Sequence, residues 1–358
     1  MSNQTRAALI GAGLMGDMHT RSIQRAGAIL QVVATSTPAK SVAAAARYSA
    51  RRSATPEEAA VAEDVDVVHI CTLNNAHQAI AELALRAGKH VVCEKPLSTE
   101  LADAQAMADL AATTGLVASV PFVYRFYPTV REARGRIAAG ELGALHVLHG
   151  SYLQDWLSRP GDDNWRVDPA LGGPSRAFAD IGVHWCDMTE FVSGHRITRL
   201  TARMKTAYDS RIKNGQANKD VATIMFETDG GAIGSAVISQ VSPGRKNRLW
   251  FSLDGADRAV CFDQELPETL WVGGRDVNKI VHRGGESNTF GTHLNRVPVG
   301  HPQGYQDCFD LFVNDTYTAI AGAPVDGLPL FADGLRAAVL TNAVLASAAS
   351  QTWIDIPA

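Results

Sequence analysis

One short segment near the amino terminus constrains the fold more than any other part of the sequence. An apolar run, Ala7–Ile10, leads directly into residues 11–16, GAGLMG, and a helix-forming stretch follows. A G-x-G-x-x-G turn between the first strand and the first helix of a parallel sheet is typical of dinucleotide binding. Its glycines allow a tight turn, approach to a pyrophosphate and close helix packing, and the helix end adds N–H groups and positive charge. The alternative is a glycine-rich turn in another kind of α/β protein.

The first third of the chain alternates β-branched runs with alanine-rich stretches, which predicts a parallel sheet covered by helices. The predicted strands are Ala7–Ile10, Leu30–Ala34, Val65–Cys71, His90–Cys93 and Val117–Val120. The predicted helices between them are Met15–Ala26, Ala39–Tyr48, Ala76–Ala87 and Leu101–Thr113. The fold class is therefore α/β, with a doubly wound Rossmann sheet at the amino end.

After about Pro121 the pattern changes to strand-like runs separated by turn residues, which predicts a large, mostly antiparallel open sheet. The predicted strands are Leu145–Tyr152, Ile197–Thr206, Ala222–Glu227, Gly231–Gln240, Arg248–Leu253, Ala259–Phe262 and Glu268–Val272. The predicted helices are Thr129–Ala139, Ser175–Val192, Gly304–Ile320 and Ala332–Ala349, with a loop and one short helical turn over Ser158–Pro174. We predict two domains, a cofactor domain over residues 1–122 and a substrate-binding and oligomerisation domain over 123–358.

Charge and composition exclude several classes of protein. The 358 residues carry 33 Lys and Arg against 37 Asp and Glu, so a basic surface for nucleic acid is not expected. Five widely spaced cysteines without a C-x-x-C pair predict no metal site and fit a reducing cytoplasm. A signal peptide and a membrane-spanning run are also missing, so we expect a cytoplasmic protein that does not bind membranes.

The end of the second predicted strand bears on the choice between NAD and NADP. An acidic residue there normally binds the ribose hydroxyls of NAD, but this chain has Thr35-Ser36-Thr37 and no Asp or Glu from Met18 to Pro56. A 2′-phosphate could be held by the hydroxyls of Ser36 and Thr37, with Lys40 as countercharge. The alternative is a solvated basic helix face, with NAD bound without an acidic clamp.

A second motif follows the fourth core strand, where Glu94-Lys95-Pro96 comes directly after Cys93. The carboxyl ends of parallel strands face the ligand crevice, so Lys95 is expected to point to the nicotinamide position. An isolated E-K-P would more simply be a surface lysine before a proline turn. Its place at a strand end, in the domain of the glycine turn, favours the functional interpretation.

Together these pieces make the sequence resemble the Gfo/Idh/MocA family, the glucose-fructose oxidoreductase and inositol dehydrogenase group. The matching pieces are residues 11–16, residues 87–97 (AGKHVVCEKPL), Tyr124-Arg125-Phe126 with Pro128, and residues 180–184 (DIGVH). The resemblance implies a Rossmann domain, a second α/β domain whose open sheet often forms oligomer contacts, and oxidation or reduction of a sugar or cyclitol. The lack of an acidic residue after the second strand departs from NAD-preferring members.

Two titratable residues in the second domain complete a candidate catalytic group. Asp180 and His184 lie four residues apart on a predicted helix and so on one face, although such a pair can also merely stabilise the helix. Alcohol oxidation needs a base for the hydroxyl proton while hydride leaves for the nicotinamide. The resemblance assigns Lys95, Asp180 and His184 to this work, with Lys95 or His184 as proton acceptor and Asp180 as an orienting or hydroxyl-binding group.

Further candidates follow from position and from the resemblance. The expected cofactor-binding residues are Gly11, Gly13, Leu14, Met15, Gly16, Ser36, Thr37, Lys40, Thr72, Asn74, His77, Glu94, Lys95 and Arg125. The expected substrate-binding residues are Lys95, Tyr124, Asp155, Trp156, Trp165, Arg166, Arg176, Asp180 and His184. Indoles among fixed polar groups suit a polyol, although Trp156 and Trp165 could equally belong to the core.

These observations favour an NAD(P)-dependent dehydrogenase that oxidises a ring secondary alcohol of a sugar, sugar derivative or inositol. Two other functions stay open: glycoside cleavage through transient ring oxidation and elimination, and a non-catalytic NAD(P)-sensing protein. The expected partners are a small carbohydrate or cyclitol and further copies of the chain, as a dimer or tetramer formed through the second sheet.

Overall fold

The structure, a computed structural model, describes residues 4–213, 216–217 and 219–357. The chain divides into two compact units. The first holds the described parts of Met1–Val123 and Tyr305–Ala338, and the second those of Tyr124–Gly304 and Val339–Ala358. Within the described ranges, no helix combines the length and the apolar character needed to cross a membrane.

A six-stranded parallel sheet forms the centre of the first unit, in the order β3-β2-β1-β4-β5-β6. Its strands are β1 (Arg6–Ile10), β2 (Ile29–Ala34), β3 (Arg52–Ala54), β4 (Val67–Ile70), β5 (His90–Cys93) and β6 (Ala118–Ser119). The predicted Rossmann sheet is therefore confirmed. The strand order reverses between β1 and β4, and such sheets bind ligands beyond the carboxyl ends of the strands at that point.

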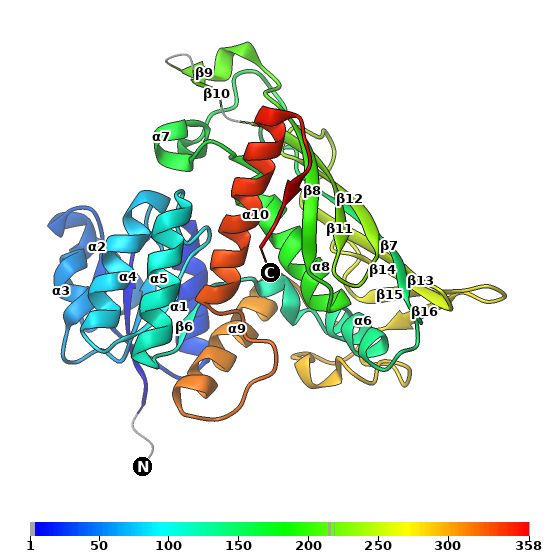
Figure 1. Cartoon of the computed structure of the whole chain (residues 1–358). Coiled ribbons are helices and arrows are strands. Elements are labelled where there is room, and N and C mark those ends of the chain that lie inside the picture. The colour runs from blue at the N-terminus through cyan, green and yellow to red at the C-terminus, as the bar shows by residue number, and fades with distance from the viewer. Residues whose placement is uncertain (1–3, 214–215, 218, 358) are drawn as a thin grey trace. The chain divides into compact units, whose positions relative to one another are not determined.

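Helices connect the strands of this sheet, as Figure 1 shows in blue and cyan. They are α1 (Leu14–Arg25), α2 (Pro38–Tyr48), α3 (Pro56–Val61), α4 (His77–Arg86) and α5 (Leu101–Thr114). The predicted elements do not include β3 and α3. The edge strand β3 has only three residues, too few for a hydrophobic pattern, whereas α3 does carry a start signal: Thr55 and Glu58 form a capping box.

A late helix, α9 (Tyr305–Ile320), belongs to the first unit. The Ser22 hydroxyl of α1 donates to Asp310 Oδ1 over 2.6 Å, and the Ser119 and Thr316 hydroxyls lie 3.2 Å apart. The compact units therefore do not follow the single boundary after residue 122. The functional division into cofactor and substrate domains stays a prediction.

The second unit is built on a nine-stranded sheet in the order β16-β15-β14-β13-β7-β12-β11-β8-β17. All neighbours are antiparallel except β12 and β7, which confirms the predicted mostly antiparallel sheet. Its strands are β7 (Leu145–Leu153), β8 (Ile197–Lys205), β11 (Val221–Thr228), β12 (Ile233–Ser239), β13 (Arg248–Gly255), β14 (Arg258–Asp263), β15 (Thr269–Gly274), β16 (Lys279–His282) and β17 (Ile354–Asp355). A separate short ribbon pairs β9 (Ile212–Lys213) with β10 (Gln216–Ala217).

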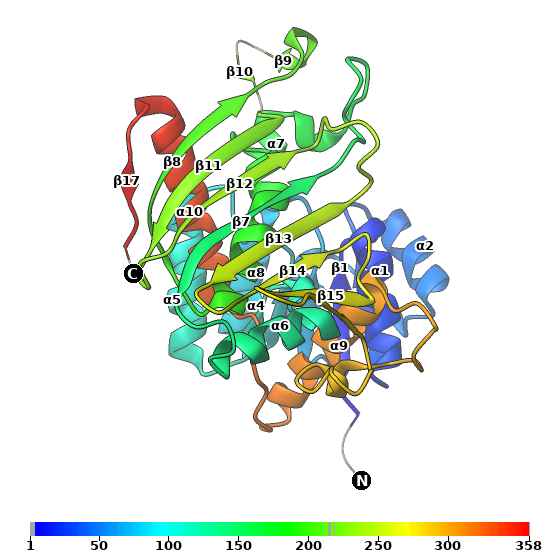
Figure 2. The ribbon, with the colours of Figure 1, turned by 90° about the vertical axis from the view of Figure 1, so that its right-hand side faces the viewer.

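Burial alternates along the central strands of this sheet, as expected where one face is covered and the other faces solvent. Figure 2 shows the open face toward the viewer, with α6 and α8 behind the sheet. The helices that complete the chain are α6 (Pro128–Ala138), α7 (Pro169–Gly172), α8 (Val183–Ser193) and α10 (Phe331–Ser350).

The prediction of one continuous helix over Ser175–Val192 was wrong. A π-helical turn, Phe178–Gly182, comes first and the α-helix α8 follows it. A Cβ atom on Gly182 would lie 2.6 Å from Cδ2 of Phe178, so the phenylalanine ring packs directly on the glycine backbone. Turns of this kind are frequently found at functional sites, and this one carries Asp180.

Candidate functional site

The glycine turn after β1 has the geometry that its sequence predicts. Gly11 has φ +103°, and a Cβ atom on it would lie 2.3 Å from the carbonyl oxygen of Cys71. A Cβ on Gly16 would lie 2.4 Å from the Gly11 carbonyl oxygen, so the third glycine brings α1 against the turn. Both positions exclude any larger residue.

The middle of the turn is open. Gly13 is exposed, and a Cβ atom on it would meet nothing within 4 Å. Leu14 is 73% exposed at the start of α1, with Met15 next to it half-buried. The first N–H groups of a helix have no partner within it. Open space, helix N–H groups and a partial positive charge together fit a pyrophosphate.

At the end of β2 the predicted hydroxyl groups are present on the surface. Ser36, Thr37 and Lys40 are all exposed. Thr37 is the N-cap of α2, and its hydroxyl accepts a hydrogen bond from the backbone N–H of Lys40 over 3.3 Å. Thr37 therefore has a structural role in starting the helix beside its predicted role toward the cofactor.

Several of the nearby cations have carboxylate partners. Arg47 lies 2.7 Å from Asp17, and Arg52 lies 2.7 Å from Asp64. Arg25 forms an ion pair with Asp310. The basic character of the segment is thus partly balanced within the first unit.

Lys95 follows β5 at the carboxyl edge of the sheet and is half-buried. The preceding residue, Glu94, is buried, and its Oε2 accepts from the Lys95 backbone N–H over 3.2 Å. Its Oε1 lies 3.1 Å from Nε2 of buried His19. Burial opposes ionisation of Glu94, but the hydrogen bond from His19 and the charges of His19 and Lys95 hold its pKa below the usual value. Glu94 thus fixes the Lys95 loop, and its assignment to the cofactor stays a prediction.

Behind Glu94 lies a chain of buried rings. Nδ1 of His19 is 2.8 Å from Nδ1 of His69, whose Nε2 is 2.8 Å from the hydroxyl of Tyr317. Burial lowers the pKa of His69 and the charge of His19 adds to the effect. Burial also raises the pKa of Tyr317. These contacts connect Glu94 through His19 and His69 to Tyr317.

His77, predicted to bind the cofactor, is a buried residue at the start of α4. Its ring is fully buried, with Nδ1 at 2.9 Å from the carbonyl of Pro96 and Nε2 at 3.3 Å from that of Thr72. Both ring nitrogens are therefore used to tie the loop after β4 to the loop after β5. Asn74 of the same loop is buried, and Thr72 is half-buried, with its hydroxyl donating to Leu73.

In the second unit, Asp180 lies on the π-helical turn and His184 in the first turn of α8. The side chain of Asp180 is 18% exposed, and its Oδ1 lies 3.6 Å from Nε of Arg166. His184 is 6% exposed, and its ring meets the ring of Tyr124 edge-on with centroids 4.9 Å apart. Asp180 is thus partly open to solvent, whereas His184 is buried.

Tyr124 is buried beside His184 and belongs to a run of polar contacts. Its hydroxyl lies 2.5 Å from the hydroxyl of Tyr152, which donates to Oδ1 of Asn247 over 2.8 Å. The same Asn247 oxygen accepts from Nε2 of Gln154 over 2.6 Å. The predicted substrate residue Tyr124 is therefore held by neighbours on β7 and before β13.

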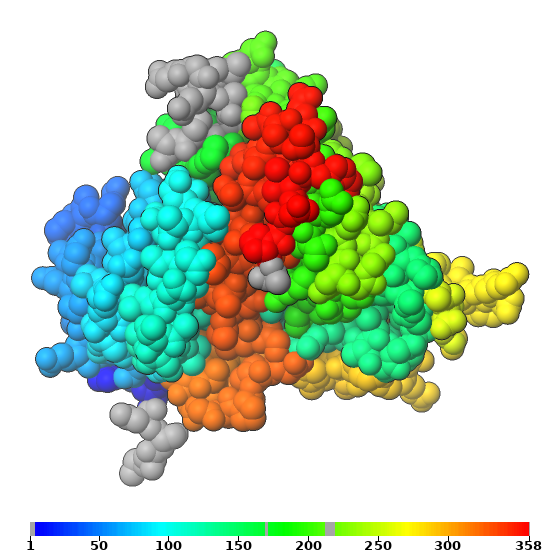
Figure 3. All heavy atoms as spheres, viewed as in Figure 1, coloured from blue at the N-terminus to red at the C-terminus, as the bar shows by residue number. Residues whose placement is uncertain are grey.

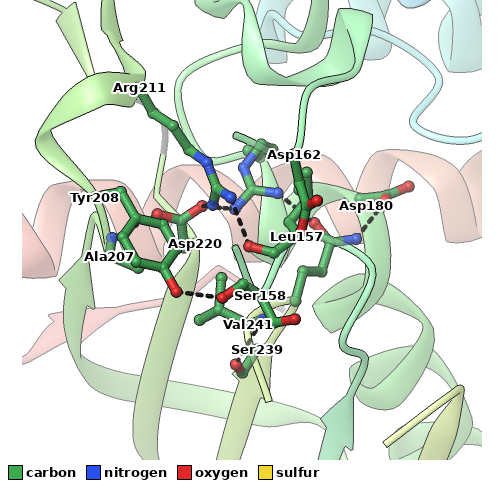
Figure 4. A network of polar contacts seen from close by, with 12 residues as sticks. Leu157, Ser158, Asp162, Asp180, Ala207, Tyr208, Arg211, Asp220, Ser239 and Val241 are labelled. Atoms are coloured by element: carbon green, nitrogen blue, oxygen red, sulfur yellow. Dashed lines mark hydrogen bonds and ion pairs between the residues drawn. The ribbon is translucent and has the colours of Figure 1, made fainter. Parts of the chain in front are cut away.

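Arg176, predicted to bind the substrate, takes part in a buried network of polar contacts. It is 1% exposed and forms an ion pair with Asp220, and its Nη1 donates to Oε1 of Gln240 over 2.6 Å. Nε2 of Gln240 in turn donates to Asp180 Oδ2 over 2.7 Å. Figure 4 shows this network around Asp220 and Asp180. Buried Arg176 therefore supports Asp180 through Gln240.

The remaining candidates in the second unit differ in their exposure and in their side-chain contacts. Trp156 is 36% exposed and donates to Oε1 of Gln154 over 2.8 Å, so it is not a core residue. Trp165 is half-buried under the guanidinium of Arg166, 4.4 Å from its ring centroid. Asp155 accepts from Lys246 over 2.6 Å, and this bond lowers the pKa of its carboxyl.

Arg125, expected at the cofactor, forms a buried ion pair with Asp187 of α8 and lies over the ring of Phe191, 4.7 Å from its centroid. Arg125 therefore links the segment that follows β6 to α8. Its assignment to the cofactor came from its place after a strand end, a signal that does not reveal the partner on α8.

Two polar residues of the site were missed from the sequence. Gln240 and Asn247 follow β12 and precede β13, and each bonds to more than one side chain of the network. A single polar residue at the end of an antiparallel strand carries no recognisable pattern. Only the pairing of β7 with β12 and β13 brings them beside Gln154.

Among the described residues, no group of three or more His, Cys, Asp or Glu side chains is arranged to hold a metal ion. The five cysteines are free thiols. Burial raises the pKa of Cys71, Cys93 and Cys308 well above the usual value, so these thiols are poor nucleophiles.

Comparison with known proteins gives a consistent result over both units. Residues 5–122 match the oxidoreductase family with an NAD-binding Rossmann fold, named GFO_IDH_MocA, and residues 130–259 match the C-terminal domain of the same family. The chain belongs to the Gfo/Idh/MocA family. It is an NAD-binding oxidoreductase, as the resemblance implied.

Individual relatives cover the whole chain. A levoglucosan dehydrogenase of Pseudarthrobacter phenanthrenivorans is 29% identical over 98% of this chain and 97% of its own length. The inositol 2-dehydrogenase of Rhizobium meliloti is 27% identical over 98% and 99%. A solved levoglucosan dehydrogenase in complex with NADH and levoglucosan superposes with a TM-score of 0.91 at 28% identity, covering 99% of this chain and 100% of that one. An oxidoreductase domain protein from Kribbella flavida gives 0.90 at 30% identity over the full length of both.

Proposed function

We propose that the protein is an NAD-dependent dehydrogenase that oxidises a ring secondary alcohol of an anhydrosugar or a related pyranose. The observation that carries the proposal is the pair Asp180 and His184: Asp180 lies on a π-helical turn and accepts from buried Gln240, and His184 lies in the first turn of α8 against the ring of Tyr124. A relative of matched length is named levoglucosan dehydrogenase, and a solved relative of that name holds NADH and levoglucosan.

The cofactor fits the residues of the first unit. The turn of Gly11, Gly13 and Gly16 and the amino end of α1 would hold the pyrophosphate, and Lys95 lies at the carboxyl edge of the same sheet. When bound, the nicotinamide accepts a hydride from the carbinol carbon. Glu94 and His77 hold the Lys95 loop in place through contacts with the Lys95 N–H and the Pro96 carbonyl oxygen.

The chain's own residues then manage the substrate proton. We propose that Lys95, Asp180 and His184 act on one substrate molecule. His184 accepts the hydroxyl proton on a ring nitrogen, the Lys95 ammonium donates a hydrogen bond to the same oxygen, and Asp180 binds a neighbouring hydroxyl. Tyr124 limits rotation of the His184 ring through the edge-on contact. Trp156, Trp165 and Arg166 provide the flat and polar surfaces that a sugar ring needs.

For the nucleotide, we propose that NAD is used and that NADP is tolerated. The segment after β2 offers the hydroxyls of Ser36 and Thr37 and the charge of Lys40, without a carboxylate that would repel a 2′-phosphate. Relatives are described with NADH, which supports NAD as the working cofactor. The free thiols fit a reducing cytoplasm as the place of action.

We also propose that copies of the chain associate through the open face of the large sheet. Val147, Met225, Ile233 and Val237 are 36–61% exposed on β7, β11 and β12, and their cross-strand pairing places them on one face (Figure 2). The turn between β15 and β16 adds exposed Val277 and stands clear of the surface around it, in yellow in Figure 3. Light scattering should give a dimer or tetramer, and Ile233→Glu should give a monomer; a monomeric wild type would contradict this proposal.

A substrate screen tests the proposed function. The purified protein is incubated with NAD+ or NADP+ and a panel that contains levoglucosan, myo-inositol and common pyranoses, and reduced nicotinamide is followed by absorbance. We expect net NADH formation with levoglucosan or a close analogue and a ketone product. Cleavage of a glycoside without NADH accumulation would instead support the elimination mechanism. Cofactor binding without turnover of any sugar, cyclitol or glycoside would support a sensor.

A further inference from the structure

We propose that Gln240 is a positioning residue for Asp180, locked in its orientation by the buried ion cluster of Arg176, Asp220 and Arg211. The proposal rests on the proposed function, in which Asp180 binds the substrate. Gln240 lies outside the motifs by which the chain is recognised, and it acts through Asp180 without contacting the substrate.

The orientation of the Gln240 amide is fixed by chemistry. The side chain is fully buried, and one end of its amide lies 2.6 Å from Nη1 of Arg176. A guanidinium can only donate hydrogen bonds, so the amide oxygen must face Arg176. The NH2 group then faces Oδ2 of Asp180 over 2.7 Å and Oε1 of Gln154 over 3.0 Å.

The ion cluster beneath Gln240 holds Arg176 in place. Oδ1 of Asp220 accepts from both Arg176 and Arg211, the latter over 2.8 Å, and all three side chains are at most 3% exposed. Arg211 also donates to the carbonyl oxygens of Leu157 and Arg159 over 2.5 and 2.7 Å. Figure 4 shows Arg211, Asp220 and Leu157 gathered at this point. The cluster joins the loop before the π-helical turn to the edge of β11.

The backbone conformation of Arg176 also indicates that its surroundings hold this residue in place. Arg176 has φ +32°, a left-handed conformation that costs energy for a residue with a side chain. Such a conformation persists only where the surroundings hold it. Here the ion pair with Asp220 and the bond to Gln240 hold the guanidinium against the Gln240 amide, which in turn donates to Asp180.

Gln240 holds the Asp180 carboxylate more firmly than Arg166 does. Arg166 lies 3.6 Å from Oδ1 with a side chain 32% exposed, so solvent weakens this pair. The bond from Gln240 is shorter and its donor is buried. Loss of this bond should therefore let the Asp180 carboxylate rotate about its side-chain torsions.

The contacts of Gln240 extend toward the second catalytic side chain. Gln154 continues to Asn247, which also accepts from Tyr152, and Tyr152 meets Tyr124 beside His184. One run of hydrogen bonds thus begins at Asp180 and ends at the residue that packs on the His184 ring. Gln240 is the member that touches Asp180 directly.

The variant Gln240→Glu isolates this role because it keeps the shape and the bond from Arg176. Its second carboxylate oxygen faces Asp180 without a proton to donate, and the like charge opposes ionisation of Asp180. We expect kcat to fall by about 10- to 100-fold and KM to change by less than about threefold. The acidic limb of the kcat/KM profile should move to higher pH by about one unit.

Gln31→Glu is the matched control. Gln31 Nε2 donates to Asp64 over 2.8 Å, so the substitution makes the same chemical change near the start of β2, away from the carboxyl edge of that sheet. Its kcat and pH profile should equal those of the wild type. Asp180→Asn/Gln240→Glu should have nearly the activity of Asp180→Asn alone, because Gln240 acts through Asp180.

A readout without substrate completes the test. The carboxyl carbon of Asp180, assigned by its loss in Asp180→Asn, is titrated by 13C NMR, and its midpoint should be higher in Gln240→Glu. Unchanged kcat, pH profile and midpoint in Gln240→Glu would overturn the positioning role. Wild-type kcat in Asp180→Asn would instead overturn the proposed function, whatever Gln240→Glu does, so the two failures are distinguishable.

Discussion

Asp220→Ala should strongly destabilise the second unit. The Asp220 carboxylate faces two guanidinium groups, those of Arg176 and Arg211, and it also accepts from the backbone N–H of Ala207. All three charged side chains are buried. Removing one partner of a buried ion pair costs about 3–5 kcal/mol, because the remaining charge stays buried without compensation.

For a unit of about 200 residues, a loss of about 4 kcal/mol corresponds to a decrease in Tm of roughly 10 °C. Urea unfolding and thermal melting, both followed by circular dichroism, measure the change. Asp355→Ala is the control, since Asp355 also pairs with an arginine but its side chain is 93% exposed. Its Tm should equal that of the wild type.

A Tm of Asp220→Ala within about 2 °C of the wild type would refute this reasoning. A triple variant separates charge from packing. Replacing Arg176 and Arg211 by Met together with Asp220→Leu should recover most of the stability, because apolar residues of similar volume can replace a buried ion cluster. The activity should stay low, since Gln240 then loses its donor.

The other predictions concern the cofactor turn, the catalytic residues and pH. Gly11→Ala should weaken NAD binding by more than about tenfold, as measured by calorimetry, because its Cβ would lie 2.3 Å from the Cys71 oxygen. Gly27→Ala is the control: Gly27 also has a positive φ, but a Cβ there meets open space, so this variant should bind NAD normally. Lys95→Ala and His184→Ala should each lower kcat by about 10²- to 10⁴-fold with unchanged circular dichroism, and equal turnover with the control Lys279→Ala would contradict their roles. Lys40→Ala should raise KM for NADP+ and not for NAD+; parallel changes would remove Lys40 from phosphate binding. Burial, aided by His19, lowers the pKa of His69 in the folded state below the 6.5 of an unperturbed histidine. As the pH falls, the unfolded chain therefore takes up a proton before the folded protein does. The free energy of unfolding is then constant above about pH 6.5, and below it decreases by up to about 1.4 kcal/mol per pH unit. Urea midpoints should fall less steeply in His69→Gln, and an equal slope would exclude His69 as the cause.

Local patterns explain why the cofactor half was predictable. The turn at Gly11 and Gly16 and the strands that flank it depend on neighbours in sequence, so strand, turn and helix could be placed from residues alone. The short strand β3 could not, because three residues at a sheet edge bury too little apolar surface to leave a pattern. The capping box of α3, in contrast, is a signal from which that helix could be predicted.

Long-range contacts explain why parts of the site were not predictable. Glu94 was expected beside the cofactor, but His19 lies far from it in sequence and takes its carboxylate. Arg176 was expected at the substrate, but Asp220 and Gln240 bury it. Strand position indicates which edge of the sheet a residue occupies, whereas its partner depends on elements far away along the chain.

Transfer of a deuterium label tests the central claim most directly. The protein is incubated with NAD+ and levoglucosan deuterated at every ring carbon, and the reduced cofactor is analysed by mass spectrometry. A dehydrogenase acting on a ring alcohol should produce NADH that carries one deuterium, in equal amount to a ketone product. Unlabelled NADH, or a cleaved or unchanged sugar without accumulation of NADH, would contradict the account.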